Sequence, residues 1–270
     1  MFESIQTWMR RQPVFAFYIL AFIITWLCWV PQAAYSHGFF PFDSPLLYVL
    51  GGVGPLAAAL VVARALYGKK DGEEVFKPLL RWRVGIVWYA VVLLGSVGIM
   101  LASMGLRGEL GQGVERITPS LALLLTFLKY LLAAIPEEVA WRGFALPRLQ
   151  SRYSALTSSL IIGTLWALWH LPLLFIKGTI MATYPLIPYF LGVIAAAIVY
   201  TWLYNNSKGS VLIVTIFHAA SNTVGPNAGV EQTAVILFLA AIIVIAFGPA
   251  HFSRRDKRIT QNVGVEILNR

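Results

Sequence analysis

The sequence has 270 residues, of which 58% are hydrophobic and 12% charged, and its mean hydropathy is +0.72. A chain this apolar and this poor in charge is not an ordinary water-soluble domain, so the composition predicts an integral membrane protein. The formal net charge of +9 fits a sided topology and attraction to anionic lipid, and we expect no nucleic-acid partner.

Eight windows are long and apolar enough to be membrane spans, because a transmembrane helix needs about 20 consecutive apolar residues. The sequence therefore predicts an all-α, polytopic transmembrane helical bundle with about eight spans. The windows cover residues 14–32, 46–66, 86–106, 119–138, 155–176, 184–204, 210–224 and 233–252.

Nothing in the sequence divides the chain into separate domains. We find no linker between two soluble domains and no internal repeat, so residues 1–270 are expected to form a single integral membrane domain. Its motif-bearing core is expected at about 119–224. Residues 253–270 are expected to form a basic cytoplasmic tail.

Basic residues set the expected orientation, because Lys and Arg gather in the cytoplasmic loops of membrane proteins. With both termini in the cytoplasm, only Arg107, Arg116 and Lys177 fall outside, and Lys129 lies within a span with no role assigned. We therefore expect cytoplasmic N- and C-termini. The short loops and the absence of a targeting extension favour a multi-pass protein of a prokaryotic plasma membrane.

Several features are expected to serve structure alone. Gly51, Gly54 and Gly98 lie in apolar windows, where small residues allow helices to pack closely, and a phosphate-binding loop would need a soluble setting. The segment 68–83 is the largest expected cytoplasmic excursion. Its end at Trp82 suggests an amphipathic segment anchored at the membrane interface.

The stretch 133–148, AAIPEEVAWRGFALPR, places Glu137, Glu138 and Arg142 beside the fourth window. Ionisable residues inside a membrane are costly and therefore usually face a cavity in which they have a function. In an alternative reading, Pro136 opens a separate cytoplasmic helix whose dipole the two glutamates complement. Because no N-cap residue or helix stop precedes the proline, we favour one continuous helix kinked there.

Two further polar clusters lie in later windows. Trp166 and His170 are one turn apart in WALWHLP, and His218 and Asn222 are one turn apart in FHAASN. A lone histidine in a helix is more often a hydrogen-bonded core residue, and polar pairs of this kind also hold membrane bundles together. Each cluster alone is therefore a weak signal.

Considered together, the three clusters are expected to meet inside the membrane. Glu137 and His170 lie at similar distances on either side of the polar turn QSRYSA, so two antiparallel helices bring them to one level. His218 begins roughly 15 Å beyond Lys208, which is a similar depth. Two carboxylates, two imidazoles, an amide and a guanidinium would then share one cavity.

Such a cavity suits the hydrolysis of a carbonyl group without a serine or cysteine nucleophile. Desolvation makes a carboxylate a stronger base, and Arg142 is expected to pair with Glu138, one turn away, and leave Glu137 to accept protons. An imidazole beside the base can orient water, while an imidazole N–H and an amide can stabilise an oxyanion. The sequence has no HExxH motif, so we assign no cofactor and no metal ligand, and metal dependence is left open.

The three motifs resemble those of the CPBP family of intramembrane glutamic proteases, which includes the CAAX prenyl endopeptidases and the bacterial Abi-type proteins. EEVAWR resembles the family's two glutamates, three variable residues and arginine, and the His218–Asn222 pair resembles its histidine-to-asparagine motif. The Trp166–His170 pair resembles the aromatic-to-histidine motif, with Trp in place of the usual Phe. A helical architecture open to the cytosol and laterally to lipid is also implied.

The resemblance implies roles for individual residues. Glu137 with His170 would activate the attacking water, and His218 with Asn222 would stabilise the oxyanion. The residues expected to support these four are Glu138, Arg142 and Trp166. The implied activity is that of an endopeptidase that cleaves near the C-terminus of, or within, membrane-associated or lipidated proteins or peptides. The expected partners are the lipid bilayer and such a substrate, and no oligomeric state is predicted.

Two other functions fit some of the same residues. A transporter or proton relay also places Glu, Arg and His inside the membrane, but it predicts internal symmetry, whereas the polar residues here are confined to the second half of the chain. A catalytically inactive binding or immunity scaffold on the same fold would keep the same cavity. We favour the peptidase.

Overall fold

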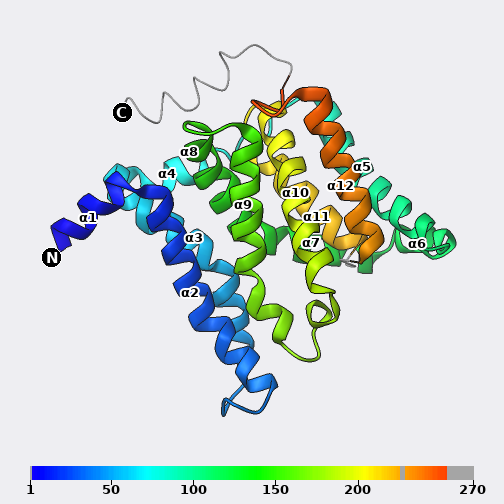
Figure 1. Cartoon of the computed structure of the whole chain (residues 1–270), viewed down its shortest axis with the longest axis horizontal. Coiled ribbons are helices and arrows are strands. Elements are labelled where there is room, and N and C mark those ends of the chain that lie inside the picture. Colours follow the sequence, from blue (N-terminus) through cyan, green and yellow to red (C-terminus); the bar gives the residue numbers. More distant parts are fainter. Residues whose placement is uncertain (1, 226–228, 254–270) are drawn as a thin grey trace.

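The computed structural model describes residues 2–225 and 229–253, and this part of the chain is helical with no strand (Figure 1). The predicted all-α class is therefore confirmed. The basic tail predicted at 253–270 lies, except for Ser253, outside the described residues. The α-helices in chain order are α1 (Phe2–Arg11), α2 (Pro13–Ser36), α3 (Pro45–Tyr67), α4 (Asp71–Phe76), α5 (Ile86–Leu106), α6 (Leu110–Arg116), α7 (Leu121–Glu138), α8 (Leu146–Gln150), α9 (Ala155–Trp169), α10 (Leu186–Asn206), α11 (Val211–Val224) and α12 (Val230–Phe247).

Six helices of the described chain are long and apolar enough to cross a membrane, namely α2, α3, α5, α9 with the short 3₁₀ helix Leu171–Phe175, α10 and α12. A seventh span is obtained if α6 and the helix Leu121–Gln150, which are bent by 81° to each other, count as one. Helix α11 is apolar but has only 14 residues, which is about 21 Å of helix and shorter than a bilayer core of roughly 30 Å. The predicted total of about eight spans is therefore not reached by length and composition, and it stays a prediction.

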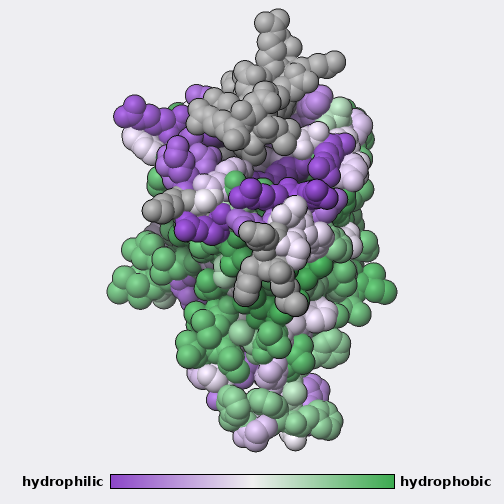
Figure 2. Space-filling view, turned by 90° about the vertical axis from the view of Figure 1, so that its left-hand side faces the viewer, coloured by the Kyte–Doolittle hydropathy of each residue, from purple (hydrophilic) through white to green (hydrophobic). Residues whose placement is uncertain are grey.

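The connections predicted to be cytoplasmic lie together at one end of the bundle. The backbone N–H of Ala155, at the start of α9, donates to the carbonyl of Ala250 at 2.8 Å, and the hydroxyl of Ser210, before α11, donates to the carbonyl of Arg81 at 2.6 Å. Hydrophilic side chains gather over the upper part of the molecule and hydrophobic ones over the lower part (Figure 2). The cytoplasmic position of this end, and of the termini, stays a prediction.

The helix that carries the two adjacent glutamates runs without a break from Leu121 to Gln150, as the sequence predicted. Pro136 lies inside it. The irregular part follows the proline: Val139–Ala145 is a π-helix, in which the N–H of Leu146 donates to the carbonyl of Trp141, five residues back. Such wide turns are frequent at functional sites, because they redirect the side chains that follow.

Small residues in α3 allow close contact with α2. A Cβ atom at Gly54 would overlap the hydroxyl of Thr25, and one at Gly51 would overlap the indole of Trp29. The structural interpretation of these two glycines is thus confirmed. The same interpretation of Gly98 was wrong, because a Cβ atom there would meet no heavy atom within 4 Å.

Helices α9 and α10 approach each other closely at Gly163. A Cβ atom at this position would lie 2.7 Å from the Cα atom of Ile194. Less than one turn further along α9, the ring of Trp166 packs against that of Tyr200 of α10, with centroids 5.6 Å apart. The close approach therefore brings the aromatic side chains of both helices into the middle of the bundle.

Candidate active site

Glu138 and Arg142 form an enclosed ion pair within the α7–α8 helix. Arg142 Nη1 lies 2.9 Å from Glu138 Oε1, and neither side chain is exposed, at 0% each. The pairing predicted from their one-turn spacing is confirmed. His218 of α11 lies with Nδ1 2.8 Å from the same carboxylate oxygen. Since a carboxylate oxygen accepts, we assign the N–H to Nδ1, and Glu138 joins the first and third motifs.

Two aromatic rings enclose the guanidinium of Arg142. Its Cζ atom lies 4.5 Å from the ring centroid of Trp166 and 4.5 Å from that of Tyr200. The negative face of an aromatic ring attracts a cation, and this attraction is stronger where water is excluded. Both rings also contact His218, at centroid distances of 5.5 Å and 5.7 Å. Tyr200 was not predicted from the sequence, because an aromatic residue in an apolar window looks like ordinary packing.

Glu137 has different surroundings from its neighbour. Its Oε2 atom accepts a hydrogen bond of 2.8 Å from the indole N–H of Trp166. Its side chain remains 13% exposed, whereas that of Glu138 is fully enclosed. Of the two carboxylates, Glu137 is therefore the one that a substrate or a water molecule can reach.

His170 lies beside Glu137, and its hydrogen bonds define its tautomer. Nδ1 lies 2.9 Å from the backbone carbonyl of Trp166, which can only accept, so we assign the proton of the neutral ring to Nδ1. Nε2 then carries a lone pair and lies 3.9 Å from Glu137 Oε2. This distance is too long for a direct hydrogen bond. The two acceptors thus lie close enough for one water molecule beside them to donate to both.

The second half of α9 is tied to the N-terminal helices through Trp169. Its indole N–H donates to the hydroxyl of Thr25 in α2 at 2.7 Å, and that hydroxyl donates to the carbonyl of Gly51 in α3 at 2.8 Å. The ring of Trp169 packs edge-on against His170, with centroids 4.5 Å apart. The connection joins helices that are far apart in the sequence, so no local spacing predicts it.

Asn222 differs from the other predicted site residues in having no side-chain hydrogen bond, among the described residues, that links it to them. It lies one turn beyond His218 on α11 and is half-buried. No side-chain hydrogen bond is recorded for it within residues 2–225 and 229–253. Its role beside an oxyanion stays a prediction.

No three-ligand cluster for a metal ion is found in the described part of the chain. No three His, Cys, Asp or Glu side chains of residues 2–225 and 229–253 lie together so that they could hold an ion. That the site residues include no metal ligand stays a prediction.

The fold and the site define a polytopic helical membrane protein with a buried Glu–Arg–His cluster next to an accessible Glu–His pair. Residues 119–224 match the family described as type II CAAX prenyl endopeptidase Rce1-like. The chain is also 25% identical, over 260 residues, to CAAX prenyl protease 2 of Methanococcus maripaludis, with 85% of this chain and 92% of that protein covered. Both matches are to CAAX prenyl proteases, so the chain is similar to proteins of this kind.

Proposed function

We propose that the protein is an intramembrane endopeptidase that hydrolyses a peptide bond with a water molecule activated by Glu137. The similarity to CAAX prenyl proteases supports the endopeptidase activity. The relative is a CAAX prenyl protease, which supports a substrate that is membrane-associated or lipidated and is cleaved near its C-terminus or within it. The observation that carries the mechanism is the contrast between accessible Glu137 and enclosed Glu138.

The attacking water is held by the two facing acceptors. Glu137 Oε2 and His170 Nε2 are 3.9 Å apart, so one water molecule can donate a hydrogen to each at an ordinary distance of about 2.8 Å. Its lone pairs then point away from both side chains and toward a substrate carbonyl carbon. Glu137 takes a proton as the water oxygen attacks, while His170 stays neutral and orients the water.

The negative charge that develops on the carbonyl oxygen needs hydrogen-bond donors. The Nδ1–H of His218 is already donated to Glu138, so His218 serves an oxyanion through Nε2–H, which requires the imidazolium form. The amide of Asn222, one turn along α11, is the second donor. The protonated Glu137 then gives its proton to the leaving amine nitrogen as the C–N bond breaks, which restores the base and releases a carboxylic acid and an amine.

The other two functions are weaker accounts of the same residues. A transporter or proton relay does not explain the similarity to CAAX prenyl proteases, nor the position of one glutamate between an indole donor and a nearby imidazole. An inactive scaffold keeps every contact described above, so turnover alone separates it from an enzyme.

The test is cleavage of a membrane-tethered peptide by the purified protein in liposomes. We expect Glu137→Gln to abolish turnover while the thermal unfolding midpoint stays unchanged, because the amide cannot accept the proton. Glu115→Gln, at an exposed glutamate of α6, is the matched control and should leave turnover unchanged. Full activity of the Glu137 variant would remove this residue as the base. Peptides with and without a C-terminal isoprenoid separate the substrate classes, and flux of a solute into sealed vesicles would favour the transporter.

A further inference from the structure

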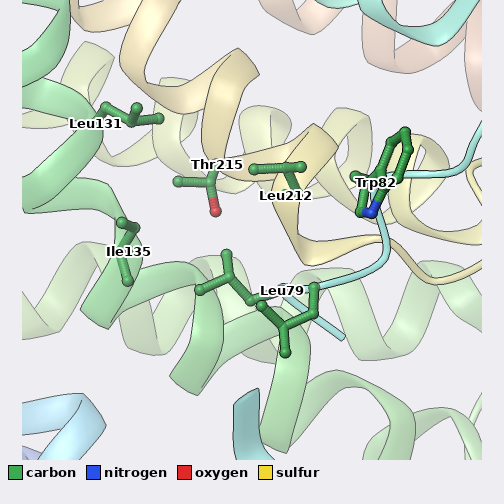
Figure 3. A pocket seen from close by; sticks show the side chains of 7 residues that line it. Leu79, Trp82, Leu131, Ile135, Leu212 and Thr215 are labelled. Carbon is green, nitrogen blue, oxygen red and sulfur yellow. The ribbon is translucent and has the colours of Figure 1, made fainter. Parts of the chain in front are cut away.

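An apolar groove opens next to the helices that carry the buried cluster. Its walls are Leu131 and Ile135 of α7, Leu212 and Thr215 of α11, and Leu79, Leu80 and Trp82 from the segment before α5 (Figure 3). The volume is about 390 Å³, within the range of small-molecule sites. The hydroxyl of Thr215 donates within its own helix, to Val211 at 2.9 Å, so this side chain adds its methyl group to the wall.

A basic pocket adjoins the groove and shares two of its walls, Leu80 and Trp82. Its volume is about 230 Å³, and its other lining residues include Arg81, Arg83 and Lys208. Among the described residues that line it there is no Asp or Glu. Three cations from two chain segments therefore surround one small space, with an apolar cavity on the other side of a shared wall.

Two of the three cations have contacts that position them, Arg81 with the backbone and Arg83 with a ring. Arg81 Nη1 donates to the carbonyl of Lys208 at 3.1 Å, which fixes these two residues side by side. The guanidinium of Arg83 lies 4.9 Å from the ring centroid of Trp82. The Trp82 side chain itself is 59% exposed, as suits an aromatic residue at the membrane interface, where one edge contacts lipid and the other contacts water.

We propose that the groove and the pocket together form a binding site for one anionic phospholipid. An acyl chain occupies the groove between α7 and α11, and the phosphate lies against Arg81, Arg83 and Lys208. An apolar ligand would leave the three cations without a partner in the ligand, and a free anion would leave the groove empty. A phospholipid with a net negative headgroup matches both halves, because basic residues near a membrane surface attract anionic lipids.

The site lies within one helical turn of the proposed catalytic apparatus. Ile135 precedes Glu138 by three residues on α7, and Thr215 precedes His218 by three residues on α11. A bound acyl chain therefore contacts both helices at the level just before the Glu138–His218 hydrogen bond. In this arrangement the acyl chain fills the groove between α7 and α11.

The experiment measures lipid binding and makes no use of peptide cleavage, so it is independent of the proposed function. Purified full-length protein in a neutral detergent receives phosphatidylglycerol or phosphatidylcholine with identical acyl chains, and native mass spectrometry counts the lipid retained. We expect preferential retention of phosphatidylglycerol. Arg83→Gln and Lys208→Gln should each weaken it about fivefold and leave phosphatidylcholine unchanged, since each removes one attraction to an anionic headgroup.

Two further arms test the groove and the specificity. Leu131→Trp fills the groove and should reduce binding of both lipids, and Leu212→Phe is a second groove variant if the first lowers the unfolding midpoint. Arg116→Gln with Lys177→Gln, at two exposed basic residues elsewhere, is the matched control and should bind as the unchanged protein does.

Three results would overturn the phospholipid site. Equal retention of the two lipids, with no effect of the basic variants, removes the headgroup contact. Competition by inorganic phosphate, with no effect of the groove variants, leaves a site for free anions only. Displacement of phosphatidylglycerol by a prenylated peptide assigns the groove to the substrate instead.

Discussion

At the scale of single residues, two adjacent glutamates of one helix have opposite surroundings. Glu138 accepts from Arg142 and His218 and is fully enclosed, while Glu137 accepts from an indole and remains reachable. Glu138 is closed off by its partners, whereas a water molecule can reach Glu137. This difference supports the division of labour that we propose between them.

The indole N–H of Trp166 is expected to position the base. Trp166→Phe keeps a ring against Arg142 but removes the hydrogen bond to Glu137. A hydrogen bond to a charged group contributes about 1.5–3 kcal/mol, so we expect kcat to fall by roughly tenfold or more, with KM little changed. Trp202→Phe is the matched control, because the indole N–H of Trp202 has no partner among the described residues. An equal loss in both variants would indicate a packing effect instead.

Residue spacing predicted part of this site and not the rest. The one-turn interval between Glu138 and Arg142 was sufficient to predict their pairing, because that interval places two side chains on one helix face. The bond from Trp166 to Glu137 joins two helices, so no local spacing contains it. Tyr200 was missed for a related reason: hydropathy does not distinguish an aromatic ring that binds a cation from one that fills space.

At the scale of helices, two irregular features position the site: the π-helix that follows α7 and the close contact between α9 and α10. The continuous helix through Pro136 was predicted, because no cap or stop interrupts the sequence there. The π-helix at Val139–Ala145 was not, because no residue type in that stretch marks a wide turn. The close contact of α9 and α10 at Gly163 likewise follows from tertiary packing.

Gly163 is expected to be intolerant of any side chain. Gly163→Ala places a methyl group 2.7 Å from the backbone of Ile194, and overpacking of this kind costs about 1–3 kcal/mol. Gly98→Ala is the matched control, since the space there is open; it should be neutral or stabilise by about 0.5–1 kcal/mol through helix propensity. The measurement is the free energy of unfolding in detergent. Equal stabilities of the two variants would contradict the close approach.

At the scale of the whole molecule, hydropathy predicted a helical membrane protein, while its total of about eight spans stays a prediction beside the six or seven found in the described residues. Hydropathy did not show that α11 has only 14 residues, or that α6 and the helix Leu121–Gln150 are bent by 81° to each other. The three polar clusters were expected to converge, and residues of all three meet in the Glu137–Trp166 and Glu138–His218 hydrogen bonds. The sidedness of the bundle is a property of the membrane and needs its own measurement.

Sidedness can be measured with single cysteines, because the chain has only one, Cys28. In a Cys28→Ala background, Arg152→Cys should react with a membrane-impermeant thiol reagent only from the cytoplasmic side, and Lys177→Cys only from the opposite side. The basis is the distribution of Lys and Arg among the loops. Labelling of both positions from the same side would refute the predicted orientation, and labelling with the two sides exchanged would invert it.

The contact between Trp169 and Thr25 has a consequence for how much of the chain the site requires. Every motif residue lies within residues 119–224, yet the indole that flanks His170 is fastened to α2, and through Thr25 to the backbone of α3. A fragment cut to those bounds would retain the whole signature and lose the support behind one of its imidazoles. The N-terminal helices carry no motif of their own, yet through Thr25 they hold the indole that supports His170.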